Sequence, residues 1–253
     1  MATQPVAAVL FDLGGTLWEY RPNLTVEGVL TGVAPQAIAL LPPEQAARLE
    51  PREVAVAVRR AYVELEQEAA TGDTKPVPGE LPVLRGLASL GLTVDAETAR
   101  AMLAALYVPE RRTTQLLAGV DDLLRTLARR NVRIGIVSNR MHGGALLLDD
   151  LDYFGISHFF LSMIASCEVG QMKPHPALFR RALDELGVTA QEAVMVGDDL
   201  RADIGGAQQV GMRAIWVRRP PDRPEPAPAG VPDVTRLDQV LPVLERMGLS
   251  GAA

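Results

Sequence analysis

The sequence is poor in several residue types, and each shortage excludes a class of protein. Its single cysteine, Cys167, cannot form an internal disulfide and indicates a reducing compartment. No basic N-terminal segment precedes an apolar stretch, and no apolar run reaches the length of a membrane span, so we expect a cytoplasmic protein. Positive charge is also in deficit. The formal net charge of -6 at pH 7 argues against a general surface for nucleic acid or for a membrane.

Lysine is nearly absent. Arginine supplies 23 of the 25 basic residues, and the two lysines are Lys75 and Lys173. With 253 residues, 48% of them hydrophobic, the chain is long enough to bury a substantial core as one large domain or as a core with an insertion. We therefore expect a globular monomer or homodimer whose partner is a small molecule.

The first apolar run, residues 7–11, ends abruptly in the carboxylate of Asp12. Five apolar residues in a row suit a strand that is buried on both faces, and the pair Gly14 and Gly15 lets the backbone turn sharply after it. Asp12 is then expected to project from the carboxyl end of a strand, which is where ligands bind in open α/β sheets. An aspartate in this place can also merely cap the next turn, and the rest of the chain decides between the two readings.

Two regions of different character follow. From about Thr25 to Tyr107 the pattern predicts amphipathic helices without a convincing strand, which indicates an inserted helical module. The longest of these helices covers residues 51–70, with Tyr62 on its apolar stripe and Arg59 and Glu66 among the residues of its polar face. From residue 119 onward helices and strands alternate, which predicts a parallel sheet sandwiched by helices. The expected division is an α/β core of residues 1–18 and 113–253 and a helical domain of residues 19–112.

Polar side chains follow three predicted strands at the point where each strand ends. Asp12 follows the first, Ser138 and Asn139 follow the strand over 132–137, and Asp198 and Asp199 follow the strand over 193–196 after one glycine. All strands of a parallel sheet end at one edge, so these residues converge although they are distant in sequence. Lys173 lies in a loop before a helix, from which its ammonium can reach the same edge. The sequence therefore predicts an anion site with a metal.

Four motifs together resemble the haloacid dehalogenase (HAD) superfamily in order and spacing, over nearly the whole chain. They are Asp12-Leu-Gly-Gly-Thr16-Leu, Ser138-Asn139, Lys173-Pro-His-Pro-Ala-Leu-Phe and Gly197-Asp198-Asp199-Leu-Arg-Ala-Asp203. The resemblance implies a Rossmann-like three-layer α/β core with an inserted α-helical cap of the first class (C1). Most members transfer phosphoryl groups with magnesium, which implies Mg²⁺ as the cofactor here.

The chemistry of these residue types is consistent with phosphoryl transfer. The Asp12 carboxylate can attack phosphorus and form an aspartyl phosphate, which splits hydrolysis into two easier steps. Lys173 and a metal ion would offset the repulsion between this carboxylate and a phosphate dianion, and the Ser138 hydroxyl would donate a hydrogen bond. Further contacts to the substrate are expected from Gly14, Gly15, Thr16, Asn139 and Arg140.

The expected Mg²⁺ site needs oxygen ligands, which Asp12 and Asp198 supply. The family likeness assigns a third ligand, a main-chain carbonyl, to Gly14. Asp199 or Asp203 is expected to orient these ligands through hydrogen bonds. For one small ion to bridge them, the carboxylates of Asp12 and Asp198 must lie within about 8 Å of each other.

Gly14 departs from the family pattern. Family phosphatases usually carry a second aspartate at this position, which protonates the leaving alkoxide and then activates water. Glycine can do neither, and the loss of a general acid/base commonly costs about two to four orders of magnitude in rate. Three readings follow: a slow phosphatase, or one with a good leaving group or a cap-supplied acid; a phosphonatase or dehalogenase, which does not need that aspartate; and a phosphate-binding or partner-binding relative without turnover.

The residues favour the first reading. Dehalogenases attack carbon and do not need magnesium, so an acidic cluster would gain them nothing. A phosphonatase needs a cap lysine for a Schiff base, and Lys75 is the one candidate besides Lys173. The leading hypothesis is a Mg²⁺-dependent hydrolase that acts on a small phosphorylated metabolite through a phosphorylated Asp12, enclosed by the helical cap.

Overall fold

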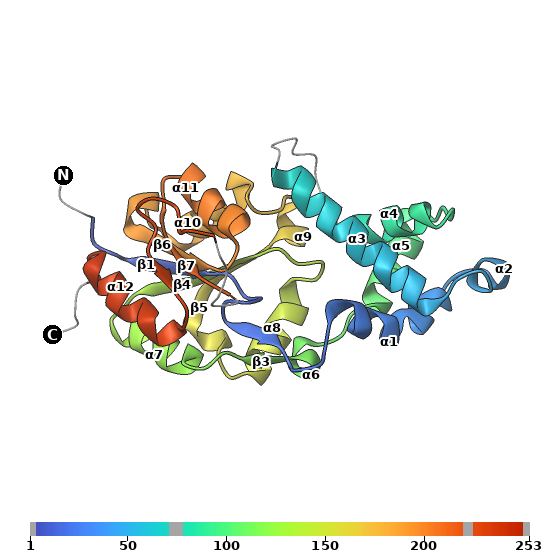
Figure 1. The fold of residues 1–253 in the computed structure, drawn as a ribbon, viewed down its shortest axis with the longest axis horizontal. Coiled ribbons are helices and arrows are strands. Elements are labelled where there is room, and N and C mark those ends of the chain that lie inside the picture. Colours follow the sequence, from blue (N-terminus) through green and yellow to red (C-terminus); the bar gives the residue numbers. More distant parts are fainter. Residues whose placement is uncertain (1–3, 71–77, 220–224, 250–253) are drawn as a thin grey trace.

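The computed structural model describes residues 4–70, 78–219 and 225–249, and it has an α/β lobe and a helical lobe (Figure 1). Lys75 lies outside the described residues. Among the described residues, no helix combines the length and the apolar character needed to span a bilayer.

The α/β lobe is built on a six-stranded sheet in which all paired strands are parallel. In spatial order the strands are β5 (Phe160–Ala165), β4 (Arg133–Ser138), β1 (Ala8–Phe11), β6 (Ala193–Gly197), β7 (Arg213–Val217) and β8 (Asp233–Val234). Strand β1 is central, and its last residue, Phe11, is paired with Ile136 of β4 and Val196 of β6. The carboxyl ends of β1, β4 and β6 therefore lie side by side at one edge.

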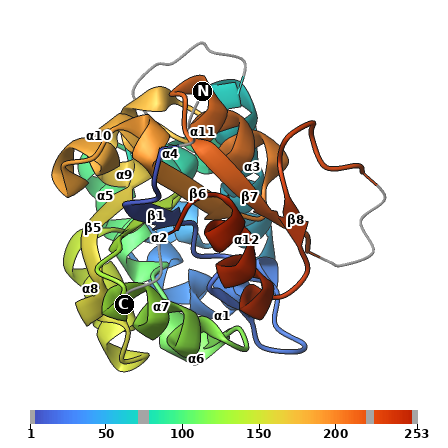
Figure 2. The same ribbon diagram turned by 90° about the vertical axis from the view of Figure 1, so that its left-hand side faces the viewer.

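Helices cover both faces of this sheet and make a three-layer, Rossmann-like core (Figure 2). Along β1 the side chains alternate, so that Val9 and Phe11 belong to one apolar cluster and Ala8 and Leu10 to the other. The first cluster includes α7 (Val120–Arg129), α8 (Gly144–Tyr153) and α12 (Val240–Arg246), and the second includes α10 (Pro176–Leu186) and α11 (Gly206–Gln209). The shorter helical segments are η1 (Ser157–Phe159), α9 (Ser166–Val169), η2 (Ala190–Glu192), the π-helix η3 (Leu200–Gly205) and η4 (Leu237–Gln239).

The helical lobe is an insertion between β1 and β4, which confirms the predicted α-helical cap of the C1 type. Its helices are α1 (Val26–Ile38), α2 (Pro43–Ala46), α3 (Pro51–Ala70), α4 (Leu81–Ser89) and α5 (Ala96–Ala105). Helix α3 packs against α1 and α4 around a separate apolar core that includes Val54, Val58, Leu87 and Met102. The residue boundaries of the two domains stay a prediction.

A short antiparallel ribbon carries the chain between the lobes. It consists of β2 (Trp18–Tyr20) and β3 (Thr114–Leu116), with α6 (Glu110–Thr113) just before the second strand. Arg21 extends the ribbon, because its main-chain N–H donates a hydrogen bond to the carbonyl oxygen of Thr113 at 2.8 Å. Its side-chain Nε donates a second one to the carbonyl oxygen of Thr114 at 3.0 Å. The sequence does not predict these two strands, since three residues are too few to show an alternating pattern.

The contact between α3 and α4 gives a matched test of the packing of the cap. A Cβ atom at Gly86 of α4 would lie 2.9 Å from the Cα and N atoms of Val58, so Gly86→Ala must push the two helices apart. We expect it to lower the free energy of unfolding by about 1–3 kcal/mol. Gly32→Ala in α1 is the control: a Cβ there meets nothing within 4 Å, and alanine should raise stability by about 0.5–1 kcal/mol.

Chemical denaturation of both variants measures the two changes. Equal effects of the two substitutions would contradict the close approach of α3 and α4.

Candidate active site

The end of β1 fixes the position of Asp12. The main-chain N–H of Asp12 donates to the Val196 carbonyl oxygen at 3.0 Å, which continues the pairing of β1 with β6 by one residue. The chain then turns tightly, with the N–H groups of Leu17 and Trp18 both donating to the carbonyl oxygen of Leu13, at 2.8 and 3.1 Å. The side chain of Asp12 is thereby held at the carboxyl edge of the sheet.

Gly15 is required by this turn for two separate reasons. Its φ of +74° lies in the left-handed region that favours glycine. A Cβ atom there would also lie 2.5 Å from Oδ2 of Asp198, so a side chain would displace that carboxylate. Gly14 has no such constraint, because a Cβ on it would meet nothing within 4 Å.

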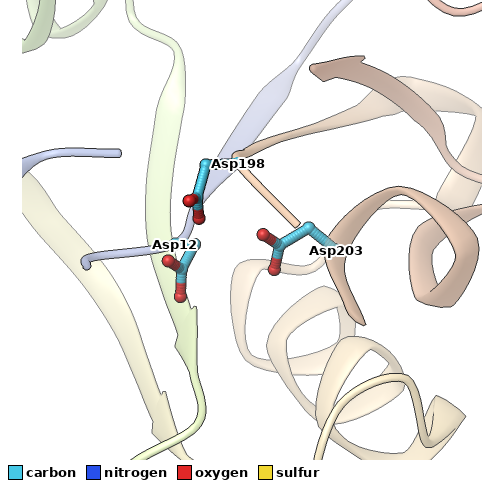
Figure 3. Close-up of side chains that lie close together, drawn as sticks. All are labelled: Asp12, Asp198 and Asp203. Carbon is cyan, nitrogen blue, oxygen red and sulfur yellow. The ribbon is translucent and has the colours of Figure 1, made fainter. Parts of the chain in front are cut away.

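Three carboxylates gather at this edge. Asp12, Asp198 and Asp203 each offer an oxygen, and the three oxygens lie within 4.8 Å of one another (Figure 3). Asp12 follows β1, Asp198 follows β6, and Asp203 lies on η3. The separation of Asp12 and Asp198 is thus well inside the 8 Å or so that one bridging ion allows.

Lys173 is the positive charge of this cluster. Its Nζ lies 2.6 Å from Oδ1 of Asp12, 2.6 Å from Oδ1 of Asp203 and 2.8 Å from the carbonyl oxygen of Val137, and its side chain is only 3% exposed. Burial by itself lowers the pKa of the ammonium, but the carboxylates of Asp12 and Asp203 outweigh burial and raise it above its usual value. Lys173 is therefore charged at neutral pH.

The remaining negative charge suits a divalent cation. Burial, together with the charges of Asp12 and Asp203, raises the pKa of the Asp198 carboxyl to about 8. Burial also raises the pKa of Asp203, against the opposing charge of Lys173. One ammonium cannot neutralise three carboxylates, and an all-oxygen donor set is what Mg²⁺ prefers. The three aspartates can thus hold a metal ion.

Asp199 lies beside the cluster in a different role. Its Oδ1 accepts hydrogen bonds from the N–H groups of Arg201 and Ala202, at 2.8 and 2.7 Å, which caps the start of η3. The N–H of Asp199 donates to Oδ2 of Asp203 at 3.0 Å and so orients that carboxylate.

A cavity of about 520 Å³ opens above these groups, lined by both lobes. Most of the residues that the sequence singles out line it, namely Asp12, Gly14, Gly15, Ser138, Asn139, Arg140, Lys173, Asp198, Asp199 and Asp203. Thr16 does not: it is fully buried, and its hydroxyl has no hydrogen-bond partner among the described residues. The roles predicted for these residues stay predictions, while their convergence is a property of the fold.

Asn139 joins three parts of the site. Its Oδ1 accepts from the main-chain N–H of Lys173 at 2.7 Å, and its Nδ2 donates to the Lys173 carbonyl oxygen at 3.3 Å. The same Nδ2 donates to Oε1 of Glu66, on the cap helix α3, at 3.2 Å. The neighbouring Arg140 places its guanidinium 5.6 Å from the centre of the Trp18 ring.

The cap contributes residues that the sequence does not assign to the site. Arg59, Tyr62 and Glu66 of α3 all line the cavity, and the Arg59 guanidinium lies 5.6 Å from the centre of the Tyr62 ring. Their spacing of three and four residues, which places them on one side of the helix, is the signal that could have found them. The other lining residues are Trp18, Glu19, Tyr20, Thr114 and Ala202.

A capped, Rossmann-like core with aspartates and a buried lysine at its carboxyl edge defines a class of hydrolases. The family model described as haloacid dehalogenase-like hydrolase matches residues 6–211, and the chain belongs to this family.

Curated relatives include phosphatases. The chain is 38% identical over 128 residues to the phosphoserine phosphatase of Thermus thermophilus, a match that covers 50% of this chain and 51% of that protein. It is 30% identical over 214 residues to the phosphoglycolate phosphatase of Rhodospirillum rubrum, covering 82% of this chain and 78% of the relative. The chain thus spans about half the length of the first relative and most of the second.

Solved structures share the fold. A HAD phosphatase from Thermococcus onnurineus superposes with a TM-score of 0.61 at 22% identity, covering 94% of this chain and 98% of the other. A 2-haloacid dehalogenase from Pseudomonas syringae superposes with a TM-score of 0.60 at 25% identity, covering 95% and 99%. The fold alone therefore does not separate phosphatases from dehalogenases.

The acidic cluster predicts opposite effects of one substitution with and without metal. A raised carboxyl pKa means that the native state binds more protons than the unfolded state. The contribution of Asp198 to the free energy of unfolding therefore decreases as pH rises from about 4 to about 8. Asp198→Asn should remove this loss and raise Tm at pH 8 in chelator. The same variant should lose the stabilisation by Mg²⁺, which for the wild type is about 2.7 kcal/mol at a hundred times Kd.

Thermal unfolding at pH 5 and pH 8, with chelator or with Mg²⁺, measures both effects. Asp121→Asn is the matched control, since Asp121 is an exposed carboxylate paired with Arg125 on α7. An undiminished Mg²⁺ shift in Asp198→Asn would show that the ion binds elsewhere.

Proposed function

We propose that the protein is a Mg²⁺-dependent phosphatase that hydrolyses a small phosphorylated metabolite through an aspartyl phosphate on Asp12. The observation that carries this proposal is the Asp12–Lys173–Asp203 chain of contacts, in which a buried ammonium holds a carboxylate beside an acidic cluster. Such a carboxylate is oriented for attack, and the lysine offsets the repulsion that an incoming phosphate would meet.

In the first step an oxygen of Asp12 forms a bond to phosphorus while the bond from phosphorus to the ester oxygen breaks. Lys173 holds the Asp12 carboxylate in place. Ser138 lines the cavity, and its hydroxyl donates a hydrogen bond to a phosphoryl oxygen. Mg²⁺ held by Asp12, Asp198 and the carbonyl oxygen of Gly14 would neutralise charge on the transferred group. Asp203 is bound by Lys173 and by the N–H of Asp199, and it would orient this arrangement.

The cavity supports a small substrate. Its volume of about 520 Å³ lies within the range of small-molecule pockets, about 300–1,000 Å³. Arg59 and Arg140 add positive charge to its wall, which favours a substrate with a second anionic group. Phosphoserine and phosphoglycolate, the compounds in the names of two relatives, are small phosphate esters that also carry a carboxylate.

The acidic cluster favours a phosphatase over a dehalogenase, because hydrolysis at carbon by an aspartate needs no divalent cation. For a phosphonatase the site would need a second lysine. Among the described residues of the cavity wall Lys173 is the lysine present, and two carboxylates already bind its ammonium.

The proposal predicts hydrolysis of reactive phosphates such as p-nitrophenyl phosphate and acetyl phosphate, with dependence on both metal and nucleophile. Chelator should abolish the activity and added Mg²⁺ should restore it. Asp12→Asn should lower kcat at least about a thousand-fold, since it removes the attacking oxygen, while Asp121→Asn should not change it. Phosphate release measures the rates. Stabilisation by phosphate and Mg²⁺ without hydrolysis across a broad panel of phosphates would instead indicate a binding protein.

A further inference from the structure

The site has room for a general acid but no such group on the loop after Asp12. Gly14 stands where family phosphatases carry their second aspartate, and the space that a Cβ would occupy there is open to 4 Å. The glycine is thus not imposed by packing. If the protein turns over alkyl phosphates, a proton donor must enter the cavity from another element, because an alkoxide is a poor leaving group.

Most ionisable groups of the cavity wall already have another role. Asp198 and Asp203 belong to the acidic cluster, Asp199 caps η3, and Lys173 binds two carboxylates. Glu19 is paired with Arg219. Among the described acidic residues that line the cavity, this leaves Glu66.

Glu66 is well placed for the task. It comes from the cap helix α3 and is half-buried, with Oε1 3.2 Å from the Nδ2 of Asn139. Asn139 in turn accepts a hydrogen bond from the main chain of Lys173, whose Nζ lies 2.6 Å from Asp12. One amide side chain therefore connects the Glu66 carboxyl to the lysine that holds the nucleophile, and Glu66 faces the cavity from the side opposite the sheet.

The surroundings of Glu66 favour a carboxyl that holds its proton longer than a surface glutamate does. Burial raises its pKa, and the charge of Asp199 adds to this effect. The hydrogen bond from Asn139 and the charges of Arg59 and Lys173 oppose it, but the net direction is upward. Tyr62, one turn earlier on α3, cannot share the role, because burial keeps the pKa of its hydroxyl well above the usual value and it cannot act as a base at neutral pH.

We propose that Glu66 is the general acid and base of this active site, supplied by the cap in place of the aspartate missing at Gly14. This role rests on the proposed phosphatase function. In the first step the Glu66 carboxyl gives its proton to the leaving oxygen as the phosphorus–oxygen ester bond breaks and the alcohol departs. In the second step the Glu66 carboxylate takes a proton from water as the water oxygen bonds to phosphorus. The bond from phosphorus to Asp12 breaks, phosphate leaves, and Glu66 is protonated again.

The decisive variant is Glu66→Gln, which keeps an oxygen to accept the hydrogen bond from Asn139 but cannot exchange a proton. The substrate is the alkyl phosphate that the wild type hydrolyses fastest in a panel including phosphoserine and phosphoglycolate. We expect kcat to fall about 100- to 10,000-fold. With p-nitrophenyl phosphate, whose leaving group needs no acid, the variant should release one equivalent of p-nitrophenolate in a burst and then turn over slowly, because the second step still needs the base.

Two further variants separate chemistry from structure. Gly14→Asp in the Glu66→Gln background returns an acid to the family position, where a Cβ meets nothing within 4 Å. The double variant should hydrolyse the alkyl phosphate at least about tenfold faster than Glu66→Gln alone. Glu64→Gln, at an exposed position of the same helix, is the matched control and should leave both activities unchanged.

Each other outcome overturns a specific statement. If Glu66 only fastens the cap to Asn139, Glu66→Gln retains activity while Glu66→Ala loses it. If the wild type turns over aryl but no alkyl phosphates, phosphate hydrolysis through Asp12 stands and the role of Glu66 as general acid is wrong. Its role as base is then wrong if Glu66→Gln shows no burst with p-nitrophenyl phosphate. If no phosphate is hydrolysed in an Asp12-dependent manner, the proposed function fails and the role of Glu66 fails with it.

Discussion

The repulsion among three carboxylates, those of Asp12 and Asp203 buried and that of Asp198 half-buried, is the constraint on which the rest of the site depends. Asp12, Asp198 and Asp203 lie within reach of one ion, and a single ammonium, that of Lys173, stands between two of them. Uncompensated buried charge costs several kcal/mol, so such a cluster persists only where apolar packing elsewhere outweighs it. Here the two apolar clusters on either face of the sheet provide that packing, and they hold the ends of β1 and β6 side by side whether or not the charges are balanced.

The two glycines in the turn after Asp12 are constrained to different degrees. Gly15 is dictated by backbone conformation and by the nearby Asp198 carboxylate, so it belongs to the architecture of the site. Gly14 has free space around it and an unremarkable φ, so nothing in the packing demands it. Packing at the Cβ position therefore does not restrict the choice of residue at Gly14.

Much of the α/β lobe follows from the sequence because its signals are local. A buried strand that ends in Asp12, Ser138 or Asp198 can be recognised from its own residues, and parallel pairing then brings these ends to one edge. The strands of the β2–β3 ribbon are too short to show a period. The choice between Asp199 and Asp203 also escapes the sequence, since it depends on how η3 turns after its first residue.

The cap shows a deeper limit of sequence patterns. Periodicity separates residues that face an apolar core from those that do not, but a polar residue that lines a cavity has the same pattern as one in bulk water. Arg59 and Glu66 are polar residues that line the cavity. Their environment depends on the contact between α3 and the α/β lobe, because Asn139 and Lys173 belong to that lobe. The hydrogen bond between Glu66 and Asn139 therefore needs both lobes, and the pattern of neither lobe alone predicts it.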